Sequence, residues 1–171
     1  MIINGDKLLE LSPIVNMEKT KLYANGVSYG LSEAGYDIRI KQTVVFTSRW
    51  GVKKITVVDA DVNGKQVVTK TNGSFVLASS MEEFNNPSNL VGVVHDKSSW
   101  ARRGLSVFNT LVEPGWKGWL TLELVYHGSD ELTIEAGSGI AQVIFHQVSC
   151  RAQYTGRYQG QANHPVSAIT A

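Results

Sequence analysis

Two Asn-Gly dipeptides set between β-branched runs constrain the fold of this chain more than any other feature. Asn63-Gly64 separates a run that begins at Ile55 from residues 66–69, and Asn72-Gly73 leads into residues 75–78. An Asn-Gly pair between apolar runs is the strongest short-range signal for a β-hairpin, because both residues accept the positive φ angles of a tight turn. The spacing therefore predicts antiparallel strands in this part of the chain.

The remaining runs predict that the rest of the chain is also built mainly of strands. A short amphipathic helix is expected over residues 6–11, and residues 81–89, which are polar and contain Pro87, are expected to form a loop or a broken helical turn. Strands are expected over residues 36–40, 42–47, 90–94, 105–108, 118–127, 132–134 and 140–145, the last two closing the sheet around residues 136–139. Without an internal repeat or a strand–helix–strand pattern, this spacing indicates a sandwich or barrel of antiparallel strands.

Length and composition favour one domain in a reducing compartment. A chain of 171 residues with 43% hydrophobic and 18% charged residues suits one core, which we assign to residues 1–151, followed by a polar tail over 152–171. A formal net charge of +1 without a basic stripe argues against nucleic-acid binding. The lone Cys150 and the lack of a signal or membrane-spanning segment predict a cytoplasmic protein without membrane attachment.

Residues 97–104 predict the first turn of a short helix that suits an anion. Ser98 is expected to be the N-cap, and Arg102 returns to the same helix face one turn later. Hydroxyls, open backbone N–H groups and cations at a helix start suit a phosphate chain. The alternative is an ordinary capped surface turn with solvated basic residues.

Glu123 is the only charged residue within the strand expected over 118–127. Period-two alternation places Leu122 and Leu124 on one face and Glu123, with Thr121 and Val125, on the other. A carboxylate partly shielded from water by such neighbours could hold a proton near neutral pH and act as a general base. The alternatives are a solvated edge-strand glutamate or one partner of a structural ion pair.

Several enzyme classes are excluded by missing motifs. One cysteine cannot build the His-Cys-Cys or three-cysteine site of a zinc deaminase, and the four histidines form no helical metal-binding pair. Neither a phosphate-binding Walker loop nor a Gly-x-Ser-x-Gly nucleophile elbow is present. These particular kinds of catalytic site are therefore not expected in this chain.

The tail from residue 152 carries little aliphatic bulk, which is typical of a mobile segment. Plain disorder is one interpretation. Its tyrosines, glutamines and Arg157 also suit a lid that closes over a charged, planar ligand.

Five blocks together resemble, in order and spacing, the dCTP deaminase family. They are Ser28–Arg39, Lys97–Arg102, Glu113–Glu123, Gly139–Phe145 and Gly156–Gln161, and the resemblance spans residues 27 to 161. It implies a mainly β, dUTPase-like fold, a distorted β-barrel or jelly roll of the β-clip type with few short helices. It also implies a homotrimer with active sites between subunits, and metal-independent deamination of dCTP to dUTP and ammonia, with Mg²⁺ arriving only on the triphosphate.

The resemblance also implies roles for individual residues. Glu123 would be the general base, Ser98 and a backbone carbonyl near Thr110 or Leu111 would hold the attacking water, and Arg102 would support the reaction centre. The residues expected to bind the substrate are Lys97, Ser99, Asn109, Thr110, Leu111, Glu113, Trp116, Gln142, Tyr154, Arg157, Tyr158 and Gln161. Among them, Lys97 and Ser99 would bind phosphates, and Glu113 the deoxyribose 3′-hydroxyl.

Residues 108–112 differ from the family's usual pyrimidine wall, which leaves open a 5-substituted cytosine as the substrate base. Other functions also stay open. Glu113 is a carboxylate in the turn where dUTPases place an aspartate, so a dUTP diphosphatase or a bifunctional enzyme is an alternative. A third alternative is a non-catalytic regulatory trimer that binds dCTP or dTTP. If the protein is an enzyme, dTTP could act as its inhibitor.

Overall fold

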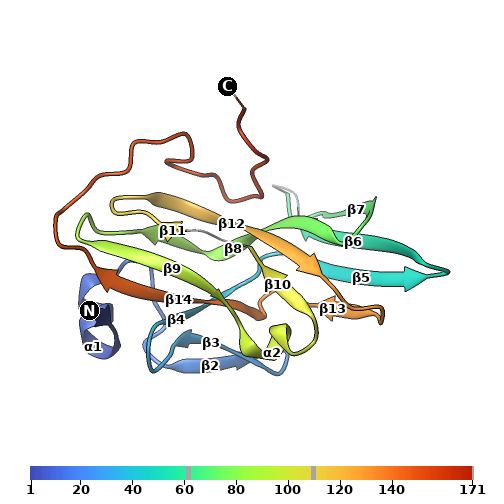
Figure 1. The fold of residues 1–171 in the computed structure, drawn as a ribbon, viewed down its shortest axis with the longest axis horizontal. Coiled ribbons are helices and arrows are strands. Elements are labelled where there is room, and N and C mark those ends of the chain that lie inside the picture. The colour runs from blue at the N-terminus through green and yellow to red at the C-terminus, as the bar shows by residue number, and fades with distance from the viewer. Residues whose placement is uncertain (61–62, 109–110, 171) are drawn as a thin grey trace.

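The computed structural model describes residues 1–60, 63–108 and 111–170 as an almost entirely β protein (Figure 1). The helices are α1 (Gly5–Leu11) and α2 (Ser98–Ala101). The strands are β1 (Ile2–Ile3), β2 (Lys21–Ala24), β3 (Val27–Leu31), β4 (Tyr36–Arg39), β5 (Thr43–Arg49), β6 (Val52–Ala60), β7 (Gln66–Asn72), β8 (Phe75–Asn85), β9 (Leu90–Asp96), β10 (Leu105–Val107), β11 (Leu111–Val112), β12 (Lys117–Tyr126), β13 (Leu132–Ile134) and β14 (Gly139–Gln147).

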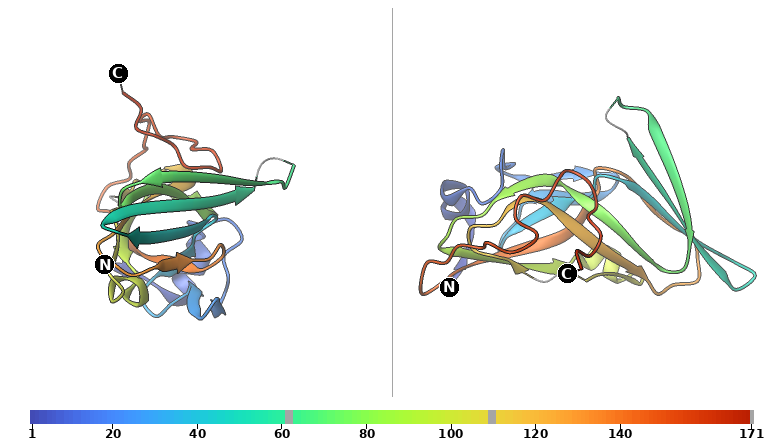
Figure 2. Two further views of the ribbon diagram at one scale, coloured as in Figure 1. Left: turned by 90° about the vertical axis from the view of Figure 1, so that its right-hand side faces the viewer. Right: turned by 90° about the horizontal axis from the view of Figure 1, so that it is seen from above.

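The strands form three sheets within the described residues. A seven-stranded sheet has the order β11-β9-β14-β4-β3-β2, with β1 also paired to β14. A three-stranded sheet has the order β10-β12-β8, and a four-stranded sheet has the order β13-β5-β6-β7. Figure 2 shows strands β5 to β7 reaching out beyond the rest of the molecule. The predicted antiparallel β architecture is confirmed.

The Asn63-Gly64 hairpin is confirmed by the pairing of β6 with β7, from Lys54 opposite Asn72 to Ala60 opposite Gln66. Gly64 has a φ of +76°, in the region that a tight turn of this kind needs. The turn at Asn72-Gly73 also leads into a strand as predicted. That strand, β8, pairs with β12 rather than with β7, so the chain changes sheets at this turn.

The prediction of a loop over residues 81–89 is wrong in its first half. Strand β8 continues to Asn85, where its final residues pair with the start of β12. Phe84 is fully buried, and the buried Glu82 accepts hydrogen bonds of 2.8 Å from both the backbone N–H and the Nε of Arg39. Burial raises the pKa of Glu82, while the hydrogen bonds from Arg39 act in the opposite direction. This polar stretch can therefore adopt a strand conformation, because the buried carboxylate of Glu82 is paired with Arg39 from strand β4.

The expectation that residues 132–134 and 140–145 close one sheet around the turn at 136–139 is also wrong. Strand β13 pairs with β5, whereas β14 pairs with β4 and β9. The connecting turn bonds instead to Ile40, whose N–H donates to Ser138 O at 3.0 Å and whose carbonyl accepts from Gly137 N at 2.8 Å. The turn between the two strands is thus bonded to Ile40, and the two strands belong to different sheets.

The core lies between the sheets. Ile38, Leu122, Leu124 and Phe145 are among its fully buried side chains. The predicted N-terminal helix is confirmed as α1, and its Leu8 is fully buried. In the part of the chain that the structure describes, neither helix has the length to cross a membrane.

Candidate active site

A cavity of about 530 Å³ opens between strands β8, β11 and β12 and the C-terminal tail. Seven of the residues predicted for the site line it: Leu111, Glu113, Trp116, Glu123, Tyr154, Tyr158 and Gln161. The other lining residues are mostly apolar: Phe75, Leu77, Val94, Leu120, Thr121, Val166 and Ala168. The cavity thus combines carboxylates with apolar walls and aromatic rings, a composition that suits a nucleoside.

Glu123 reaches this cavity because of its place on β12. It lies opposite Leu77 of β8, and its backbone carbonyl accepts from Phe108 N at 2.8 Å. The predicted alternation is confirmed, since Leu122 and Leu124 are fully buried. The predicted shielding of the carboxylate is wrong for the single chain, because Glu123 is exposed. Within the described residues, its own chain leaves Glu123 open to solvent.

The turn before β12 supplies Glu113 and Trp116. The N–H of Trp116 donates to Glu113 O at 3.1 Å, and its indole ring packs 5.8 Å from the ring of Phe84. Asn86, which the sequence analysis did not identify, holds this turn in place through hydrogen bonds from its side chain. Its buried side-chain nitrogen lies 2.9 Å from Leu90 O, 3.1 Å from Val112 O and 2.9 Å from Glu113 O. The one signal in the sequence that could have identified Asn86 is its position just before Pro87. An asparagine in such a turn often forms hydrogen bonds with nearby backbone groups.

The tail runs over this turn and along β12. Tyr154 N donates to Pro114 O at 2.8 Å, Gly160 N to Lys117 O at 3.0 Å, and Trp119 N to Gln161 O at 3.2 Å. Further along, Val166 N donates to Thr121 Oγ1 at 3.1 Å, which brings the end of the tail over the face that carries Glu123.

Side chains add to this docking. The indole N–H of Trp116 donates to Tyr158 O at 2.6 Å, and Lys117 N donates to Gln159 Oε1 at 2.8 Å. Arg157 is not among the lining residues, and it donates to Ile169 O at 3.0 Å within the tail itself. The structure thus brings Tyr154, Tyr158 and Gln161 to the cavity, and does not bring Arg157 there.

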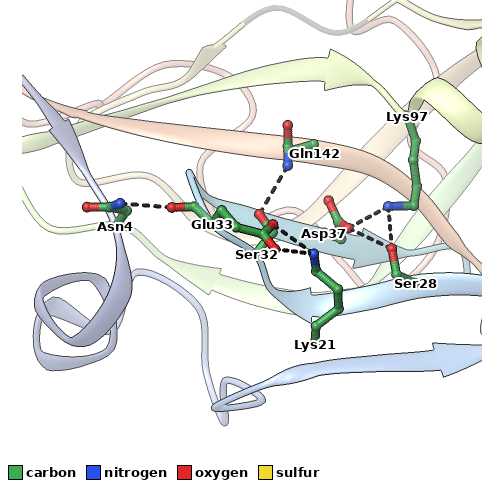
Figure 3. A network of polar contacts seen from close by, with 8 residues as sticks. All are labelled: Asn4, Lys21, Ser28, Ser32, Glu33, Asp37, Lys97 and Gln142. Carbon is green, nitrogen blue, oxygen red and sulfur yellow. Dashed lines mark hydrogen bonds and ion pairs between the residues drawn. The ribbon is translucent and has the colours of Figure 1, made fainter.

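The predicted phosphate cradle, residues 97–104, forms α2 and the turn after it. The N-cap is Lys97 rather than Ser98, and within the described residues neither α2 nor Arg102 contributes to the cavity lining. Ser98, Ser99 and Arg102 are exposed, whereas Lys97 is buried, with its ammonium bonded to Asp37 and Ser28 (Figure 3). In Figures 1 and 2, α2 and the tail lie on opposite sides of the molecule.

Gln142 also lies apart from the cavity. It sits on β14, and its side-chain amide donates to Ser32 Oγ at 3.0 Å (Figure 3). Asn109 and Thr110 fall outside the described residues. Among the residues that are described, no group of three or more His, Cys, Asp or Glu side chains is placed to hold a metal ion.

Residues 16–148 match a family model described as dCTP deaminase-like, which covers most of the strands. The chain belongs to this family. Among curated relatives, the dCTP deaminase of Campylobacter curvus is 36% identical over 167 residues, covering 89% of this chain and 87% of the relative. The dCTP deaminase of Albidiferax ferrireducens is 38% identical over 156 residues, covering 81% of this chain and 80% of the relative.

The fold of this dCTP deaminase-like chain is similar to that of the dUTPase of Staphylococcus bacteriophage 80alpha. That structure has a TM-score of 0.51 and 14% identity, and the match covers 84% of this chain and 94% of the dUTPase. The predicted dUTPase-like fold class is therefore confirmed. Within this fold, most of the described predicted site residues fall into two groups, one around the cavity and the other at α2 and its flanking residues, whereas Gln142 and Arg157 belong to neither.

Proposed function

We propose that this protein is a dCTP deaminase that converts dCTP and water to dUTP and ammonia. The single observation that carries the proposal is the cavity that gathers Glu123, Glu113 and Trp116 under the tail of a dCTP deaminase-like chain. Apolar walls at Phe75 and Leu77 suit a pyrimidine ring, and Glu123 is the carboxylate at their edge.

The chemistry needs one group that first accepts and then returns a proton. Glu123 takes a proton from water as the oxygen attacks C4 of the cytosine, and it passes that proton to N3. The second proton of the water then moves to the exocyclic nitrogen, the C4–N bond breaks, and ammonia leaves. One carboxylate that cycles between its two protonation states supports every step.

We propose that the site is completed between subunits of a homotrimer. The separation of the α2 group from the cavity supports this arrangement, because Ser98 and Arg102 of one subunit could then face the Glu123 of another. Contact with a second subunit would also cover the open side of Glu123 and exclude solvent water, which strengthens electrostatic interactions at a reacting centre.

Four smaller proposals belong with this function. The triphosphate enters as its Mg²⁺ complex, dTTP competes with the substrate as an inhibitor, and the enzyme works in the cytoplasm. The tail over residues 152–171 acts as a lid on the bound nucleotide.

The deciding experiment is product analysis by chromatography. The purified protein is incubated with Mg²⁺ and, separately, dCTP, 5-methyl-dCTP and dUTP. We expect dUTP from dCTP, no dUMP, and no product from the Glu123→Gln variant. Glu131→Gln makes the same change at an exposed carboxylate that does not line the cavity, and it should retain activity.

The other outcomes separate the alternatives. Turnover of 5-methyl-dCTP alone would assign the substrate to 5-substituted cytosines. Formation of dUMP would show diphosphatase activity, and its loss in Glu113→Gln would make that carboxylate catalytic. Absence of product from every nucleotide would refute the enzyme and leave a binding protein.

A further inference from the structure

A second cavity, of about 380 Å³, adjoins the candidate active site. It opens between β8 and the inner face of β6 and β7, two strands of the projecting arm formed by β5 to β7 (Figure 2). Leu77 of β8 lines both cavities, and it lies directly opposite Glu123 of β12. Leu77 is therefore a wall common to the two cavities, next to the candidate catalytic carboxylate.

The tail marks a second place where the two cavities adjoin. Pro165 lines the second cavity, and the next residue, Val166, lines the first. The hydrogen bond from Val166 N to Thr121 Oγ1, at 3.1 Å, fixes the tail at this point. A group that leaves the first cavity past Leu77 therefore enters the second cavity under the tail.

The arm contributes one face of its sheet to the second cavity. Val67, Thr69 and Thr71 of β7 line it, which are alternate residues and so share a face. At the inner end of this face, Ile55 lies opposite Thr71 and is fully buried. At the outer end, Val67 lies opposite Asp59 and is 47% exposed. The same face therefore begins in the core and continues as the wall of an open cavity.

A buried amide holds the carboxylate of Asp59 at this cavity. Gln42 is 1% exposed, and its Nε2 donates to Asp59 Oδ2 at 2.9 Å and to Ser79 Oγ at 3.0 Å. Its Oε1 accepts from Ser79 N at 2.8 Å, and Asp59 Oδ1 accepts from Ala60 N at 2.8 Å. A carboxylate has about four acceptor positions, so Asp59 can accept further hydrogen bonds from a ligand. The cavity therefore contains a preformed acceptor for a hydrogen-bond donor.

The lining suits a group with an apolar stem and a donor at its end. Val57 and Val67 supply apolar walls, while Asp59 and Thr69 supply oxygen atoms. A cationic amine gains most from Asp59, because hydrogen bonds between charged groups are the stronger ones. The volume far exceeds the roughly 30 Å³ that one water molecule occupies in the liquid, so the cavity has room for a chain of several atoms.

The proposed reaction brings one atom of the base to the boundary between the cavities. Glu123 acts at N3 and C4 of the cytosine, and C5 is the ring atom on the other side of C4. Glu123 has Phe108 on one side, where Phe108 N donates to its backbone carbonyl, and Leu77 on the other. With N3 turned toward residues 108–112, C5 points toward Leu77.

We propose that the base binds in this orientation and that the second cavity receives a substituent on C5. The inference rests on the proposed function and names its substrate class. These substrates are deoxycytidine triphosphates whose 5-substituent is several atoms long and ends in a hydrogen-bond donor. The substituent runs past Leu77, and Asp59 accepts the hydrogen bond from its end. The reaction at C4 is unchanged, since water adds, ammonia leaves, and the substituent keeps all its atoms and bonds.

Two nucleotides with substituents of similar length test the proposal. In 5-(3-aminoallyl)-dCTP and 5-propynyl-dCTP the chain on C5 has three carbon atoms, and only the first ends in an ammonium group. Product formation is followed by chromatography. We expect kcat/KM for the aminoallyl nucleotide to be within about threefold of dCTP or higher, and about tenfold above the propynyl nucleotide. Turnover of dCTP without turnover of either extended nucleotide would overturn the proposal.

Asp59→Asn tests the acceptor, because it removes the charge and keeps the size of the side chain. The ratio of kcat/KM for the aminoallyl nucleotide to that for the propynyl nucleotide should fall by about tenfold. Asp130→Asn makes the same change at an exposed carboxylate that does not line the cavity, and it should leave this ratio as in the parent. An equal ratio in Asp59→Asn and the parent would refute the assignment.

Val67→Trp tests the cavity itself by filling it. It should lower kcat/KM for both extended nucleotides, relative to dCTP, by about tenfold or more. Val68→Trp is the matched control, because Val68 is the next residue of β7, is 54% exposed and points to the other face. If Val67→Trp instead changes the oligomeric state in light scattering and spares the extended nucleotides, this face is a subunit contact and the proposal is wrong.

Binding measurements separate failure of this proposal from failure of the proposed function. If the parent protein deaminates none of the nucleotides, the proposed function fails, and the second cavity is then tested by calorimetry alone. The aminoallyl nucleotide should still bind about tenfold more tightly than the propynyl nucleotide, and Asp59→Asn should remove this difference. Equal affinities of the two nucleotides for the parent protein would refute the second cavity as their binding site.

Discussion

Gly118→Ala is expected to detach the tail from β12 while leaving the sheet intact. Gly118 has a φ of +127°, and a Cβ here would lie 2.6 Å from both the N and the O of Gln161. The clash is with backbone, so the tail has to move away. The two hydrogen bonds on either side, Gly160 N to Lys117 O and Trp119 N to Gln161 O, would then break.

The magnitude follows from those two bonds. At about 1 kcal/mol net for each, the docked state of the tail loses about 2 kcal/mol, which lowers its population relative to the open state by about 30-fold. The strain of a positive φ adds about 1–3 kcal/mol to the cost of folding. Gly137→Ala is the matched control, because Gly137 has a φ of +84° and nothing within 4 Å of its added Cβ.

The assay combines amide hydrogen exchange with kinetics. In Gly118→Ala, protection of the Trp119 and Gly160 amides should fall by about 30-fold, and KM for dCTP should rise by up to the same factor if the docked tail holds the nucleotide. Gly137→Ala should show neither change, although both variants lose thermal stability. Retained protection in Gly118→Ala, or an equal KM in the two variants, would refute the reasoning.

Three further outcomes are expected. Deleting residues 152–171 should weaken dCTP binding far more than it lowers the melting temperature; a large fall in melting temperature would make the tail structural. Burial raises the pKa of Tyr36 from 10.0 to about 12, so the folded state keeps a proton that the unfolded chain releases, and stability should fall by up to about 3 kcal/mol between pH 10 and 12. The free energy of unfolding of Tyr36→Phe, measured with urea, should not show this decrease between pH 10 and 12. A pH profile identical to that of the parent protein would contradict the prediction. Asn86→Ala leaves three backbone carbonyls without their shared donor and should cost about 2–4 kcal/mol in urea unfolding, whereas exposed Asn85→Ala should cost almost nothing.

Features determined by neighbouring residues could be predicted from the sequence. The Asn63-Gly64 hairpin depends on the φ angles of the turn itself, and the alternation along β12 depends only on strand geometry, so both are visible in one short window. The same alternation was enough to direct Glu123 to one face. Its exposure in the single chain could not be predicted, because it depends on which other segments cover that face.

Features determined by distant partners could not be predicted in this way. The stretch over residues 81–85 looks like a polar loop until Arg39 is placed beside Glu82. Lys97 looks like a surface cation until Asp37, which lies 60 positions earlier, is placed against its ammonium. In both cases the buried charge is tolerated only because of a partner from another strand, and a sequence window contains no information about that pairing.

The way the tail is attached bears on how this segment can change during evolution. Its bonds at Tyr154, Gly160 and Gln161 join main-chain atoms to main-chain atoms, so they do not depend on which side chains those residues carry. Many side chains of the tail could therefore be exchanged without loosening it. An inserted or deleted residue between positions 154 and 160 would instead shift every later donor and acceptor along β12. Homologous tails that keep the same docking should thus agree in length, and should vary in composition mainly where the side chain contacts neither the turn before β12 nor the cavity.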